Sequence, residues 1–237
     1  MQEGFHLFGA PHMSALGATA VLGVAGAALA KTSGRADRFV RLSLALALAA
    51  AVLVFLFLLW RDGLLHWRRV VPLQICDFAI LLAIAALVTR ARPLCEILYF
   101  WALTGTLLAM VMPAVSEPMH SPVTAFYFLL HGLVVVSAAA LTWGSRVYPK
   151  PGAPLRVLAF TIVYAACVAV VNVLTGSNFL FLRARPAQPT LLDYFGPWPI
   201  YLFVVAGVAL ALFVLLERVT PAGADDGARP RALSSRR

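Results

Sequence analysis

The sequence predicts an all-α membrane protein with seven transmembrane helices, and three observations lead to that prediction. Of the 237 residues, 62% are hydrophobic and only 12% are charged. The mean hydropathy is +0.88, a composition that does not describe a soluble chain. Apolar runs close to the roughly 20 residues that a spanning helix needs recur along the chain. We therefore expect a polytopic membrane protein with short loops and no sizeable soluble domain.

The predicted spans are separated by polar turn segments. Pro72 and Pro197 suit the first turn of a helix, because proline lacks an N–H that would have no partner there. The residues before the first run include Glu3 but no lysine or arginine, so this run does not resemble a cleaved signal peptide and is expected to remain as a helix. The expected spans are at about 12–30, 42–60, 72–89, 94–114, 123–143, 156–175 and 197–216.

The distribution of basic residues predicts the orientation. With the N-terminus outside, 14 of the 19 lysines and arginines fall in loops or the tail on the inner side, and 5 fall outside. The positive-inside rule therefore predicts an outer N-terminus and an inner C-terminus. We expect residues 1–216 to form one seven-helix domain, and residues 217–237 to form a disordered basic cytoplasmic tail, because that segment has almost nothing to bury.

The net charge of +9 is explained by this topology, so no nucleic-acid partner is expected. Three cysteines, Cys76, Cys95 and Cys167, lie within or beside apolar runs. Their number is odd and their spacing is not that of a metal site or a disulfide framework. The sequence therefore predicts no disulfide, no metal and no cofactor.

Polar side chains inside the predicted spans are few, and they are candidates for function because hydrocarbon makes them costly. Cys76 and Asp77 open the third span, His131 lies in the fifth, and Asn172 lies near the end of the sixth, shortly before Asn178. Their expected depths place them in the same, outer half of the membrane. A histidine beside a cysteine can generate a nucleophilic thiolate. Cys76 and His131 are thus the candidate catalytic pair, with Asp77, Asn172 and Asn178 as candidates to orient the imidazole.

Other interpretations of these residues stay open. A membrane cysteine is often a small core residue, and a single intramembrane histidine often makes only a helix-to-helix hydrogen bond. Asp77 could pair with Arg68 or Arg69. A transporter would be expected to show inverted repeats or helices broken at matching positions, and neither is found. An accessory protein would need no polar cluster at one depth.

Five sequence blocks, in order from about residue 72 to 205, resemble the YwaF family of bacterial integral membrane proteins. The blocks are Leu73–Asp77; Tyr99–Trp101 with Gly105 and Thr106; Leu130–Gly132; Asn172 with Ser177–Arg183 and Pro186; and Gly196–Tyr201. The likeness extends more faintly to His12 and does not include the tail. The resemblance implies residence in the bacterial cytoplasmic membrane.

That family is similar to transmembrane protein 164 of animals, a membrane acyltransferase that makes ether phospholipids, and more distantly to androgen-induced membrane hydrolases that use a threonine and a histidine. The resemblance implies that Cys76 accepts the acyl group and that His131 is the general base. The predicted function is therefore an acyltransferase or lipid hydrolase acting on phospholipid acyl chains, with membrane lipids as substrates. A non-catalytic accessory protein or a small-molecule transporter is the alternative, and the oligomeric state is left open.

Overall fold

The computed structural model describes residues 4–115, 117–186 and 190–221, and in these residues it contains helices and loops but no strand. Each of the seven predicted apolar runs is helical. The main helices are α1 (Ala10–Thr32), α2 (Gly34–Arg61), α4 (Ile75–Thr89), α5 (Arg92–Trp101) continued by η1 (Ala102–Thr106) and α6 (Leu107–Val111), α7 (Pro122–Ala139) continued by η2 (Ala140–Gly144), α8 (Ala153–Thr175) and α9 (Ile200–Val219). Short helices α3 (Trp67–Val70), η3 (Phe179–Phe181) and η4 (Leu191–Phe195) lie in the loops.

The all-α membrane architecture is confirmed. Six helical segments among the described residues are long and apolar enough to cross a membrane. The remaining segment, α4, has only 15 residues, or about 22 Å of helix against the roughly 30 Å of a hydrocarbon core. It is shorter than the predicted span because residues 72–74 enter it in non-helical conformation and Arg90 ends it in the left-handed region, with φ 56°.

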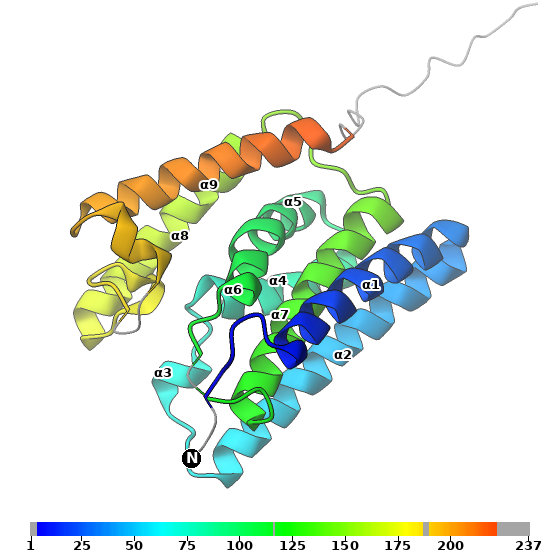
Figure 1. Cartoon of the computed structure of the whole chain (residues 1–237). Coiled ribbons are helices and arrows are strands. Elements are labelled where there is room, and N and C mark those ends of the chain that lie inside the picture. The colour runs from blue at the N-terminus through cyan, green and yellow to red at the C-terminus, as the bar shows by residue number, and fades with distance from the viewer. Residues whose placement is uncertain (1–3, 116, 187–189, 222–237) are drawn as a thin grey trace, which may run out of the picture.

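Helix α7 lies at the centre of the main bundle (Figure 1). It contacts α1, α2, α4 and the continuous α5–η1–α6 segment. Helices α8 and α9 pack on each other and form a pair at one side of the bundle. Helix α8 contacts α5, and α9 contacts η1. Side chains that project inward from α4, α5 and α7 are therefore fixed by the apolar core between these helices.

A buried charged cluster ties several helices together at one end of the bundle. The Nε of Arg41 lies 3.0 Å from the Oδ2 of Asp37, and both side chains are only about a tenth exposed. Arg41 also donates to the carbonyl of Leu87, and the Ser145 hydroxyl donates to Asp37. The Nη2 of Arg90 donates to the Ser145 carbonyl at 3.3 Å. We call these five residues the Asp37 cluster; it joins the start of α2 to the ends of α4 and η2.

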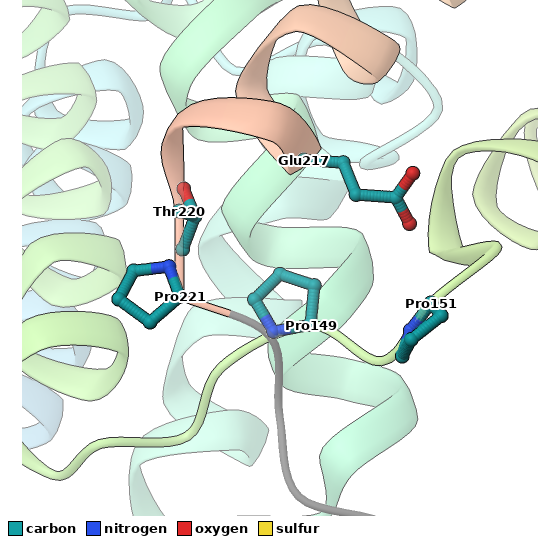
Figure 2. Close-up of a pocket in the computed structure, with 5 residues that line it drawn as sticks. All are labelled: Pro149, Pro151, Glu217, Thr220 and Pro221. Carbon is teal, nitrogen blue, oxygen red and sulfur yellow. The ribbon is translucent and has the colours of Figure 1, made fainter.

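A small hollow of about 90 Å³ lies at the end of α9 (Figure 2). Its lining offers one carboxylate, Glu217, which already accepts a hydrogen bond of 2.8 Å from the backbone N–H of Gly152. The hydroxyl of Thr220 is bonded to the hydroxyl of Tyr99 and the other lining residues are prolines, so this hollow is not the candidate site. It is lined by Pro149, Pro151, Glu217, Thr220 and Pro221.

The predicted orientation gives an expected result for reporter fusions. Because α9 ends at Val219 and the basic residues concentrate at that side, a reporter active only in the cytoplasm should work when it is fused after Arg237. A reporter active only outside the cytoplasm should work in the loop between α8 and α9 and fail after Arg237. Activity of the second reporter after Arg237 would reverse the orientation and place the candidate site in the inner leaflet.

Candidate functional site

The ends of α4 and η2 provide a common reference level for the candidate residues. Arg90 directly follows α4, Ser145 directly follows η2, and the two are hydrogen-bonded. Cys76 precedes Arg90 by 14 residues, and His131 precedes Ser145 by 14 residues. The two helices are therefore parallel and end at the same level. At about 1.5 Å per residue, Cys76 and His131 each lie roughly 21 Å from that level. Cys76 and His131 are thus at about the same depth.

Cys76 lies on the inward face of α4. It belongs to the stripe formed with Ile80, Ala83 and Leu87, positions that share one helix face, and those three residues are buried in the main core. Helix α4 also packs directly on α7. The thiol itself is half-buried, and its sulfur lies 3.9 Å from the Oδ1 of Asp77. The nucleophile candidate therefore faces the helices of the bundle.

His131 is buried, with one ring nitrogen held and the other unpartnered. Its Nδ1 lies 2.7 Å from the backbone carbonyl of Tyr127. A carbonyl can only accept, so Nδ1 carries the proton of the neutral ring and Nε2 presents its lone pair. The Nε2 atom is buried and has no hydrogen-bond partner among the described residues. The Tyr127 carbonyl therefore fixes the tautomer that a general base needs.

Tyr127 packs against His131 and links α7 to α6. Its ring packs on His131 with centroids 4.0 Å apart, and its hydroxyl donates to the carbonyl of Ala109 at 2.7 Å. Cys76 and His131 are not hydrogen-bonded to each other. They lie at about the same depth on neighbouring helices, and Tyr127 of α7 joins this helix to α6 beside His131.

The two asparagines shape a loop instead of orienting the imidazole. Asn172 is fully buried, and its side chain makes two bonds to the backbone of Phe179: Nδ2 donates to the carbonyl and Oδ1 accepts from the N–H, at 2.9 and 2.8 Å. The Oδ1 of Asn178 accepts from the N–H of Arg183, and its Nδ2 donates to the carbonyl of Ala184. These bonds use both amides to hold the turn after α8.

Asp77 makes no ion pair among the described residues, and its Oδ1 lies 3.9 Å from the Cys76 sulfur. Arg68, one of its expected partners, instead donates to the carbonyl of Thr175 and lies over the ring of Trp67. The side chain of Arg69 lies outside the described residues. Asp77 therefore sits next to the thiol, separate from the imidazole that Tyr127 holds.

One polar residue at this level was not among the sequence-predicted site residues. Thr106 ends the π-helix η1, is only 2% exposed, and its hydroxyl has no hydrogen-bond partner among the described residues. Its position in the sequence block around Gly105 was the only signal. The sequence gives no indication of a π-helix, so the missing partner becomes visible only in three dimensions.

The fold and these buried groups define a helical integral membrane protein that carries a few buried polar side chains on neighbouring segments of its bundle. The chain belongs to the TMEM164 family, whose family model matches residues 7–217. This match confirms the predicted relationship to transmembrane protein 164; the YwaF resemblance stays a prediction.

The chain is also similar to a protein of Treponema pallidum (strain Nichols) that is described as uncharacterized. The two are 29% identical over 153 residues, which is 63% of this chain and 62% of the relative. The match thus spans less than two thirds of that relative's length. No solved structure matches the chain.

Proposed function

We propose that this protein transfers or hydrolyses the acyl chains of membrane phospholipids, with Cys76 as nucleophile and His131 as general base. The observation that carries the proposal is the buried imidazole of His131, whose Nε2 lone pair is unpartnered at the same depth as an inward-facing thiol on the neighbouring helix. A buried ring nitrogen without a partner is unusual, because burial of a polar atom without a hydrogen bond is costly. A site that accepts a proton during a reaction accounts for it.

The first half-reaction forms a thioester. The Nε2 of His131 takes the proton of the Cys76 thiol, and the sulfur attacks the carbonyl carbon of a phospholipid ester. The bond between that carbon and the glycerol oxygen then breaks, and the leaving oxygen takes the proton from His131. The products are a lysophospholipid and an acyl group bound to Cys76.

The second half-reaction releases the acyl group. The hydroxyl of an acceptor lipid, or a water molecule, gives its proton to His131 and attacks the thioester carbonyl. The carbon–sulfur bond breaks and the thiol regains its proton. Transfer and hydrolysis thus share every step except the identity of the second nucleophile. The lack of a direct hydrogen bond between Cys76 and His131 is compatible with this scheme, because catalytic hydrogen bonds often tighten only when substrate binds.

A fatty-chain chloroacetamide tests the reactivity of Cys76 against matched controls in the same chain. The free cysteines include Cys95, which is buried, and Cys167, which is exposed on α8. At limiting probe, we expect peptide mapping to find the label mainly on Cys76, and His131→Ala to slow that labelling, because the imidazole no longer removes the proton. Cys95→Ala and Cys167→Ala should label like the wild type.

The opposite pattern would contradict the proposal. If Cys167 reacts as fast as Cys76 in the folded protein, then Cys76 has only the reactivity of an ordinary accessible thiol. The same conclusion would follow if His131→Ala left the labelling rate of Cys76 unchanged. In either case the chain would be better described as a non-catalytic membrane protein of the TMEM164 family.

A further inference from the structure

The hydroxyl of Thr106 has no role in the fold that its hydrogen bonds can explain. Hydroxyls in membrane helices usually donate to the carbonyl four residues earlier, and Thr104, Ser137 and Thr161 all do so, at 2.6 to 2.8 Å. Thr106 does not, although its residue is only 2% exposed. An unpaired buried hydroxyl is destabilising, so its presence calls for an explanation.

The local backbone shows why the usual partner is not used. The carbonyl four residues before Thr106 belongs to Ala102, the first residue of the π-helix η1. In η1 that carbonyl accepts from the N–H of Leu107, five residues on. The π-turn thus redirects the backbone bond and leaves the threonine hydroxyl free. Single π-turns within α-helices occur frequently at functional sites.

Thr106 lies at the depth of Cys76 and His131. Helix α5 begins with Arg92, two residues after Arg90 at the shared end, and it runs back into the bundle. Thr106 follows Arg92 by 14 residues, the same separation that places Cys76 and His131 relative to that end. The segment η1 packs on both α4 and α7. Cys76, Thr106 and His131 therefore lie at about the same depth in the bundle, on three neighbouring segments.

The face that Thr106 occupies also turns toward α7. Leu103, Leu107 and Met110 on the same segment pack with Phe128 and Val135 of α7. Thr106 lies four residues before Met110, and α6 is α-helical between them, so these two residues share one face of the segment. On α7, His131 lies between Phe128 and Val135, so both unpartnered atoms belong to the two surfaces that pack together.

We propose that Thr106 binds the carbonyl oxygen of the acyl ester, and that its hydroxyl donates a hydrogen bond to that oxygen when Cys76 attacks. This inference rests on the proposed function. The attack places negative charge on the carbonyl oxygen, and a donor held in a dry site stabilises that charge more than it stabilises the ground state. Thr106 supplies the donor, His131 Nε2 accepts the proton, and Cys76 supplies the electron pair of the new bond.

Three variants of the full-length protein in detergent or vesicles test the assignment. Thr106→Val keeps the shape and removes the donor, Thr106→Ser keeps the donor, and Thr104→Val removes a neighbouring hydroxyl that is already bonded to Phe100. With phosphatidylcholine as acyl donor, Thr106→Val should lower kcat by about 10²- to 10³-fold with a smaller change in KM. Thr106→Ser should restore most of the loss, and Thr104→Val should stay close to the wild type.

Two further measurements distinguish a catalytic role of Thr106 from a role in packing. They also test this inference separately from the proposed function. Thr106→Val should unfold at the same temperature as the wild type or higher, because an unpaired buried hydroxyl is removed. It should also react with the chloroacetamide at the wild-type rate, since displacement of chloride creates no oxyanion. Wild-type turnover in Thr106→Val, with Cys76→Ala inactive, would overturn the role of Thr106 alone. Turnover in Cys76→Ala would overturn the proposed function and this inference together.

Discussion

Replacing His131 with alanine should reduce lipid turnover near neutral pH by about 10²- to 10⁴-fold, the usual effect of removing a general base. Cys76→Ala should lose more, about 10⁴-fold or beyond, because the attacking atom itself is removed. The two variants should also differ in their response to pH. In His131→Ala the thiol must ionise unaided, so turnover should rise with pH at all values below the pKa of the thiol. Cys76→Ala should not recover at any pH.

The measurement is acyl release from a labelled phospholipid between pH 7 and pH 9, with thermal unfolding of each variant as the control for folding. His131→Gln serves as a second variant, because it retains a polar group in the cavity that alanine would leave. Equal turnover in the wild type and in both alanine variants, each correctly inserted, would show that Cys76 and His131 only pack.

Breaking the Asp37 cluster should produce the largest loss of stability. The carboxylate of Asp37 is the acidic partner of the buried Arg41 and accepts from Ser145. In Asp37→Leu the guanidinium of Arg41 would stay buried without its counter-charge, an effect of about 3–5 kcal/mol when one partner of a buried pair is removed. The midpoint of thermal unfolding in detergent should fall by roughly 6–20 °C.

Two comparisons identify the cause of that loss. The double variant Asp37→Leu/Arg41→Leu removes both charges and should recover much of the stability, since a buried pair can be replaced by apolar residues with little net loss. Asp62→Asn removes the exposed carboxylate beside Arg61 at the other end of α2 and should leave the midpoint unchanged. A double variant as unstable as Asp37→Leu would show that lost packing, not an unpaired charge, is responsible.

The main features of the fold could be predicted from sequence because hydrophobic length and charge placement determine them. The seven apolar runs all form helices, with shifted ends: residues 72–74, 112–114 and 197–199 of the predicted spans are not helical, and α4 is the shortest as a result. The similar depths of Cys76 and His131 followed from counting residues along helices that run in the same direction. Helix geometry is regular enough for such a count.

The connections between side chains could not be predicted in the same way. Asn172 was a reasonable candidate for orienting the imidazole, yet its amide is bonded to the backbone of Phe179, and the Tyr127 carbonyl holds His131. A loop backbone and a helix carbonyl leave no distinctive pattern in the sequence. The unpaired hydroxyl of Thr106 depends on a π-turn, which has no clear residue signature either.

The most direct test of the proposed chemistry is to look for the acyl group on Cys76. The full-length protein is incubated with a phospholipid that carries a labelled acyl chain, quenched in acid, digested and analysed by mass spectrometry. The mechanism predicts the mass of the acyl chain on the peptide that contains Cys76, its loss on treatment with neutral hydroxylamine, and its absence in Cys76→Ala. Turnover of the lipid with no acyl group on Cys76, even when the acceptor is withheld and the reaction is quenched early, together with unchanged turnover in Cys76→Ala, would contradict the mechanism.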